Sequence, residues 1–174
     1  VSEFGSVLLS RILDLSDVQE GVLAVIFKYC DDHQYPLLDL KDLKKVLQYA
    51  TEEGKSEFEA EYGRVASSST SAILRKIVEL ENQGAELFFG ERSFETEDLL
   101  HTDEKGRGVV NIIRLTDIQD RPKMFSTFML CLLAEIYNTF PEIGDQDKPK
   151  LVIFIDEAHL IFNQASKALL NQLE

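Results

Sequence analysis

The stretch LVIFIDEAHLIF, residues 151–162, carries the strongest structural signal in the sequence. Its first five residues, 151–155, are apolar without alternation, which is typical of a central parallel strand covered on both faces of a sheet. The stretch then continues directly into Asp156 and Glu157. Because ligands of open α/β sheets bind beyond the carboxyl ends of the strands, we expect these two acids to lie at a strand-tip crevice.

A second apolar run and a helix precede this stretch. Residues 108–115 (GVVNIIRL) are rich in β-branched side chains and bounded by glycine and Thr-Asp, which predicts a buried strand. Pro122 suits the first turn of a helix that runs to Phe140. The helix is apolar on nearly all sides, so we expect it to be sandwiched. Strand, crossover helix and strand together predict a right-handed βαβ unit, and the fold class is α/β in a mostly helical chain.

The first hundred residues contain apolar positions at three- and four-residue spacing, which predicts helices. Start signals are expected at Ser16 with Gln19, at Asp39, and at Ser56 with Glu59. The Ser67 to Ser71 run is either a break or a polar helical turn. A later helix places Ile73, Ile77 and Leu80 on one side and ends near Gly84. We therefore predict an all-α module over residues 1–104 and a partial α/β core over residues 105–174.

Composition excludes several classes of protein. The chain has 174 residues, 44% of them hydrophobic, and a net charge of −13, so no basic stripe is available to neutralise a nucleic-acid backbone. No apolar run approaches the roughly 18 to 20 residues that a membrane span needs. Only Cys30 and Cys131 occur, which favours reduced thiols and a cytoplasmic location. The first residue is Val1 and the last, Glu174, falls in a helical pattern, so we expect a fragment of a longer protein.

The adjacent acids Asp156 and Glu157 fit the chemistry of nucleotide hydrolysis. A carboxylate at this position can hold Mg²⁺ through water, which suits Asp156, and its neighbour Glu157 can polarise the water that attacks the γ-phosphate. The competing interpretation is that a strand ends here and the acids cap the following helix. His159 is either a γ-phosphate sensor or a packing residue. No G-x-x-x-x-G-K-[ST] motif occurs, so the chain alone is not expected to bind ATP tightly.

Six strings of the sequence resemble the bacterial HerA-like ATPases of the YjgR type, which carry a HerA helicase-like C-terminal region. They are LLSRILDLSDVQEGVL (8–23), LLDLKDLKKVLQ (37–48), AEYGRVASSSTSAILRKIVELENQG (60–84), FFGE (88–91), GRGVVNIIRL (106–115) and DKPKLVIFIDEAHLIF (147–162). The resemblance implies a RecA-like P-loop core with parallel strands, interrupted by an all-α insertion, and a phosphate-binding loop upstream of Val1. It implies ATP and Mg²⁺ as cofactors, with Asp156 as the metal-side acid and Glu157 as the catalytic base. It also implies a homo-oligomer, hexameric in the family, that translocates DNA through regions outside this acidic segment.

Two other functions compete with the ATPase hypothesis. The helical half is alternatively an interaction or oligomerisation module without chemistry of its own. The DEAH string, taken literally, suggests a superfamily-2 helicase, but the other motifs of that class do not occur. The resemblance places the sensor residue and the arginine from a neighbouring subunit after Glu174. Arg107, Arg114 and Arg121 lie near the ends of the predicted strands and either line a subunit interface or are ordinary surface charges.

Overall fold

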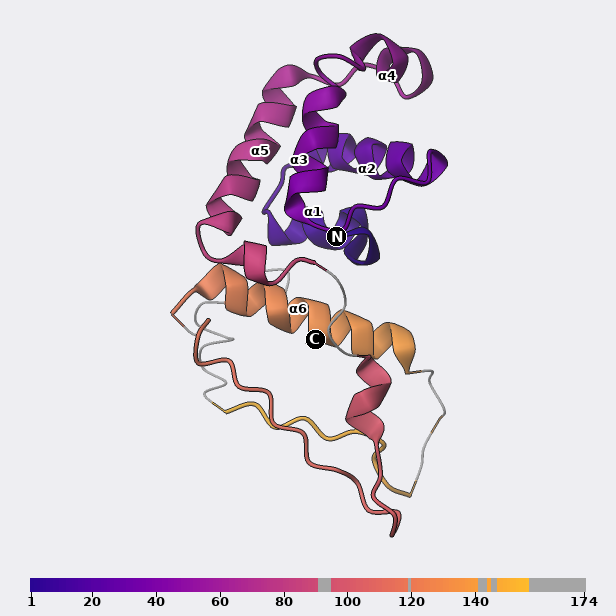
Figure 1. Ribbon diagram of the computed structural model, residues 1–174, viewed down its shortest axis with the longest axis vertical. Helices are drawn as coiled ribbons and strands as arrows, with labels where there is room; N and C mark the ends of the chain where they lie inside the picture. Colours follow the sequence, from indigo (N-terminus) through magenta and orange to yellow (C-terminus); the bar gives the residue numbers. More distant parts are fainter. Residues whose placement is uncertain (91–94, 119, 141–143, 145–146, 157–174) are drawn as a thin grey trace. The chain divides into compact units, whose positions relative to one another are not determined.

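The structure is a computed structural model that describes residues 1–90, 95–118, 120–140, 144 and 147–156 (Figure 1). It divides into two compact units, Val1–Glu91 and Arg92–Glu174. Each unit is described by itself. The predicted functional division at residue 104 stays a prediction.

The first unit is made of helices alone among its described residues. Its elements in chain order are η1 (Ser2–Phe4), α1 (Gly5–Ile12), α2 (Asp17–Asp32), α3 (Leu40–Tyr49), α4 (Lys55–Glu61), α5 (Ser67–Glu81) and η2 (Ala85–Leu87). Two of these helices start as their capping signals predict. The backbone N–H of Ser16 donates to Gln19 Oε1 at 3.0 Å, and Asp39 Oδ1 accepts from the N–H of Lys41 at 2.8 Å.

The core of the first unit lies where α1, α2, α3 and α5 meet. Helix α2 packs against α1 and α5, and α5 also packs against α3. Within these four helices the largest fully buried side chains are aliphatic, and those of α2, α3 and α5 recur at helical spacing: Leu9, Leu23, Ile26, Leu43, Leu47, Ile73, Ile77 and Leu80. Burying such a side chain contributes about 1.5–3 kcal/mol relative to leaving it exposed. This core is therefore sufficient to define the unit without help from a sheet.

Two helix boundaries differ in detail from the sequence patterns. Helix α4 begins after Gly54 and ends at Glu61, so Ser56 lies within its first turn rather than capping it, and Tyr62 and Val65 lie beyond its end. Helix α5 begins at Ser67, so the serine run forms its polar first turn. Gly84 adopts φ 93°, the left-handed conformation that glycine favours just after a helix.

The second unit is organised around one long helix. Helix α6 (Pro122–Thr139) starts with Pro122, as predicted, and packs against η3 (Thr96–Leu100). Its first half buries Met124, Phe125, Met129 and Leu130, whereas Tyr137 near its end is exposed. Because the buried residues include the four consecutive positions 124–127, the first half of the helix is covered on all sides, whereas residues 131–136 are half-buried. Among the described residues, no helix is both long and apolar enough for a membrane span.

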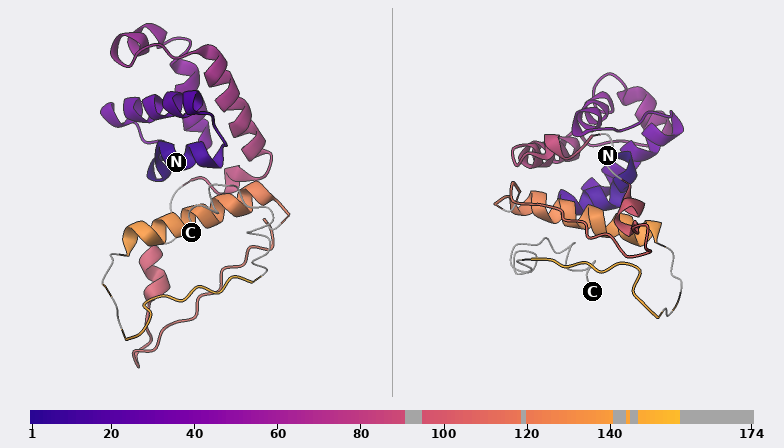
Figure 2. Two further views of the ribbon diagram at one scale, coloured as in Figure 1. Left: turned by 180° about the vertical axis from the view of Figure 1, so that it is seen from behind. Right: turned by 60° about the horizontal axis from the view of Figure 1, so that its bottom comes forward.

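The two predicted strands do not form in the described part of the chain. Residues 108–115 and 151–155 run without regular strand structure, and Figure 2, seen from two further sides, draws neither as an arrow. The prediction that both are buried is wrong for this structure, because Ile112 is 82% exposed and Phe154 92% exposed. The physical reason is that a strand exists only through hydrogen bonds to a neighbouring strand. The parallel-strand core and the βαβ unit are therefore not formed among these residues.

Candidate functional site

Asp156 is the one predicted site residue that the structure describes. It is exposed and follows directly on the extended residues 151–155. Glu157 and His159 lie outside the described residues, so the structure does not test their roles. Among the described residues, no group of His, Cys, Asp and Glu side chains is arranged to hold a metal ion.

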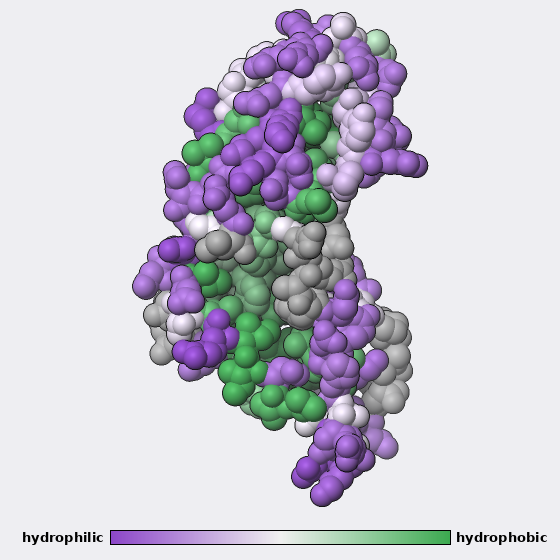
Figure 3. All heavy atoms as spheres, viewed as in Figure 1, coloured by the Kyte–Doolittle hydropathy of each residue, from purple (hydrophilic) through white to green (hydrophobic). Residues whose placement is uncertain are grey.

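The segment that leads to Asp156 is apolar and exposed. Val152 is 57% and Phe154 is 92% exposed, and residues 151–155 form no backbone hydrogen bond with another described segment. At its start, the Lys150 ammonium lies 5.8 Å from the centre of the Phe140 ring, a cation–π distance. Figure 3 shows hydrophobic residues on the visible surface in the lower part of the view. An extended segment with apolar side chains and unpaired N–H and C=O groups is suited to join a sheet rather than to face water.

The segment 108–115 has the same character. Val110 is 85% exposed, and no backbone hydrogen bond joins residues 110–114 to another described segment. Only the beginning of the segment is paired, through an antiparallel bridge between Thr102 and Gly108. The second unit therefore contains two apolar extended segments with free backbone edges among its described residues, one on either side of α6 in the sequence.

A tight turn precedes the segment 108–115, and within it Arg107 binds Asp103. The Arg107 side chain donates to Asp103 Oδ2 from Nε at 2.8 Å, and its Nη2 lies 2.7 Å from the same oxygen. The backbone N–H groups of Lys105 and Arg107 donate to Asp103 Oδ1. The backbone and side-chain hydrogen bonds from Arg107 hold the pKa of Asp103 below its usual value. The Arg107 side chain therefore stabilises the turn in which it lies.

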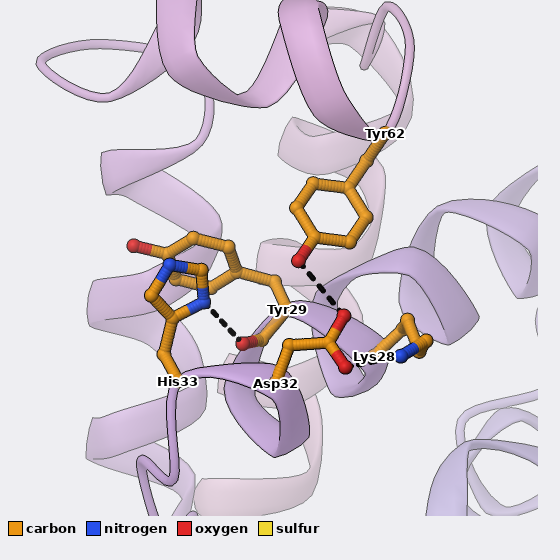
Figure 4. Close-up of polar contacts among 5 residues, drawn as sticks. All are labelled: Lys28, Tyr29, Asp32, His33 and Tyr62. Atoms are coloured by element: carbon orange, nitrogen blue, oxygen red, sulfur yellow. Dashed lines mark hydrogen bonds and ion pairs between the residues drawn. The ribbon is translucent and has the colours of Figure 1, made fainter.

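The first unit contains a polar and aromatic cluster that the sequence analysis did not single out. Figure 4 shows its centre: the Tyr62 hydroxyl donates to Asp32 Oδ2 at 2.9 Å, Lys28 forms an ion pair with the same carboxylate, and His33 Nδ1 lies 2.9 Å from the Tyr29 carbonyl oxygen. The hydrogen bonds from Lys28 and then Tyr62 lower the pKa of Asp32. A signal was present in the sequence, since four of its five tyrosines fall between residues 29 and 62.

Burial governs the ionisation of the tyrosines in this cluster. Burial, and then the nearby Glu57 charge, raises the pKa of Tyr29 to about 12. Burial, and then the hydrogen bond to Asp32, raises the pKa of Tyr62 to about 12. The pKa of Tyr49 is also raised, and there the largest cause is the hydrogen bond to Glu57. Hydroxyls with such raised pKa values stay protonated at neutral pH, so these tyrosines act there as hydrogen-bond donors.

The fold and the site define a mostly helical protein whose second unit presents apolar, strand-like segments, the last of them ending in an acid. The chain belongs to the helicase HerA-like C-terminal family, whose model matches residues 1–174. This match confirms the family resemblance seen in the sequence, while the YjgR type stays a prediction. No match was found among curated proteins or among solved structures.

Proposed function

We propose that this chain is part of a HerA-like ATPase, in which it supplies the acidic half of the ATP site. The observation that carries the proposal is the second unpaired apolar segment, residues 151–155, which ends at Asp156 and Glu157 in a chain of the HerA-like family. We infer that residues 108–115 and 151–155 become strands of a RecA-like core when they pair with strands from the rest of the protein. Both have exposed apolar side chains, and residues 110–114 and 151–155 make no backbone hydrogen bond with another described segment, as such pairing requires.

The two acids divide the chemistry between them. Carboxylate oxygens are hard ligands that suit Mg²⁺, which usually keeps several waters and takes one or two carboxylates plus phosphate oxygens. Asp156, exposed at the end of its segment, has the donor chemistry to hold such an ion through water. Glu157 accepts a proton from the attacking water and orients it towards the γ-phosphate. The bound Mg²⁺ supplies charge neutralisation of the phosphates.

The remaining parts of the site come from elsewhere. The sequence contains no G-x-x-x-x-G-K-[ST] loop to cradle the phosphates. We infer that another part of the protein provides that loop, and that a neighbouring subunit of a ring provides an arginine. DNA contact is assigned to other regions as well, because this chain carries a net charge of −13.

The catalytic assignment is tested in the full-length protein by Glu157→Gln, with ATP hydrolysis and ATP binding measured separately. We expect turnover to fall by about a hundredfold or more, with ATP binding retained. Asp147→Asn is the matched control, because Asp147 is an exposed acid that precedes the same apolar segment. Unchanged turnover in Glu157→Gln removes this residue from the role of base.

The strand assignment has a separate test that does not depend on activity. Amide hydrogen exchange of the full-length protein is expected to show protection over residues 109–114 and 151–155, because paired backbone N–H groups exchange slowly. The helices of the first unit serve as the internal reference. If both segments exchange as fast as free peptide in the full-length protein, they are not strands of a sheet.

A second function, a helical interaction module without catalysis, is supported by a different observation. The first unit has its own core yet exposes Val18, Tyr35 and Leu38. If these residues bind a neighbouring subunit, the chain self-associates in a concentration-dependent manner, and Val18→Ser weakens the association. Sedimentation that remains monomeric over the accessible concentration range contradicts this function.

A further inference from the structure

Helix α4 (Lys55–Glu61) is attached to the first unit differently from the other helices. Phe58 is its only buried side chain, whereas α2 buries five side chains and α5 four. In Figure 1, α4 lies at the edge of the unit, with a loop at each end. The free energy that holds α4 in place therefore comes from far fewer contacts than that of its neighbours.

A glycine lies at each end of α4. Gly54 immediately precedes the helix, and Gly63 follows two residues after its end with φ 85°. A glycine has access to both signs of φ, so it can absorb a change of chain direction at little steric cost. These two positions are therefore suited to act as hinges for the helix between them.

The apolar anchor of α4 is a single buried side chain, Phe58. The Phe58 ring centre lies 4.3 Å from that of Tyr29 in α2 and 5.6 Å from that of Tyr62. Phe58 is fully buried and Tyr29 nearly so. Removal of α4 would uncover the part of the Tyr29 ring that Phe58 covers, while His33, Tyr35 and Tyr49 stay against that ring and the aliphatic core of α1, α2, α3 and α5 stays intact.

Polar contacts at the surface complete the attachment. Glu57 Oε2 accepts from the Tyr49 hydroxyl of α3 at 3.0 Å, and Glu57 Oε1 lies 3.8 Å from His33 Nε2. The Tyr62 hydroxyl, just beyond the helix, donates to Asp32. Contacts of this kind at exposed positions contribute little each, because water competes for both partners.

We propose that α4 is a flap that opens as a unit about Gly54 and Gly63 and uncovers part of the Tyr29 ring, while α2, α3 and α5 stay folded. Phe58 closes the flap, and Glu57 latches it to Tyr49 and His33. Opening of this kind is a sub-global event, which requires only the α4 contacts to break.

Amide hydrogen exchange of the full chain, resolved by residue, tests the proposal. The N–H of Phe58 and Tyr62, which donate to Gly54 and Phe58 carbonyls, report on α4, and the amides of α3 and α5 report on the rest of the unit. We expect the amides of α4 to exchange at least about a hundredfold faster than the amides of α3. Equal protection of α4 and α3 overturns the proposal, because α4 then opens only when the unit unfolds.

Two variants examine the anchor and the latch. Phe58→Ala is expected to abolish α4 protection while the α3 and α5 amides keep theirs, since only the flap loses its contact. Glu57→Ala is expected to speed α4 exchange by about two- to fivefold. Glu59→Ala is the matched control, because Glu59 is in the same helix and faces only the exposed Arg64 at 4.0 Å. If Glu57→Ala and Glu59→Ala act alike, or if Phe58→Ala speeds exchange in all helices equally, the flap does not exist.

Discussion

The ion pair between Lys44 and Glu81 provides a quantitative test of how the first unit is held together. Lys44 in α3 donates from Nζ to Glu81 Oε2 in α5 at 2.8 Å, and Nζ lies 2.6 Å from Oε1. Oε1 has no well-directed hydrogen bond of its own, so it depends on the ammonium charge. The side chains are only 28% and 10% exposed, respectively. The perturbation is Lys44→Met, which keeps the length of the side chain and removes its charge.

The expected magnitude follows from the difference in exposure. A hydrogen bond to a charged group is worth about 1.5–3 kcal/mol, and breaking a fully buried pair costs about 3–5 kcal/mol. Because Lys44 is partly exposed, we expect Lys44→Met to lower the free energy of unfolding by about 2 kcal/mol. Glu81→Gln should cost only about 1 kcal/mol, because Lys44 can turn towards water. The double variant should cost less than the sum of the two changes.

The assay is urea unfolding followed by tyrosine fluorescence. Four of the five tyrosines lie in the first unit and the chain has no tryptophan, so the signal reports on that unit. Lys45→Met is the control, because Lys45 is exposed on the same helix. Equal effects of Lys44→Met and Lys45→Met, or strict additivity of Lys44→Met with Glu81→Gln, would refute the coupling between α3 and α5.

Three further predictions concern single sites in the first unit. Gly54→Ala places a Cβ 2.1 Å from Tyr49 Cε1, so the ring must move, and urea unfolding should show a loss of about 1–3 kcal/mol; an unchanged midpoint contradicts the close contact. The pKa values of Tyr29 and Tyr62 are raised from 10.0 to about 12, so the stability they contribute is complete below pH 10 and is lost as pH rises through 12. Absorbance at 295 nm should therefore show two tyrosines that ionise together with unfolding. Ionisation of all five tyrosines near pH 10 with the fold intact contradicts this prediction. The buried Ser10 hydroxyl has no hydrogen-bond partner among the described residues. Ser10→Ala should therefore raise the free energy of unfolding by about 0.5–1 kcal/mol and raise the melting temperature with it. A lower melting temperature would reveal a partner of the hydroxyl.

Local signals in the sequence were sufficient to predict most helices. Ser16 with Gln19 and Asp39 form the expected caps, and Pro122 begins α6. These signals act over three or four residues, so they operate before any tertiary contact forms. The start of α4 was missed because Ser56 with Glu59 imitates a capping box within the first turn of the helix, whose cap position is occupied by Gly54.

Long-range contacts were not predictable in the same way. The Tyr62 hydroxyl meets Asp32 across 30 residues, and Lys44 meets Glu81 across 37. No spacing rule connects residues so far apart in the sequence. Lys44 meets Glu81 because α3 packs against α5, and Tyr62, just beyond α4, meets Asp32 at the end of α2. Four of the five tyrosines lie between residues 29 and 62, but this spacing alone does not identify their partners.

The apolar segments 108–115 and 151–155 show where the two kinds of information separate. Their composition determined that they are strand-forming, and the order of residues determined that Asp156 and Glu157 follow the second one. Only the tertiary structure decided that both remain extended and exposed among the described residues, because hydrogen bonds from neighbouring strands are what make a strand. A helix needs no such partner, since it satisfies its own backbone, and for that reason most of the helices, though not the start of α4, were predicted from the sequence.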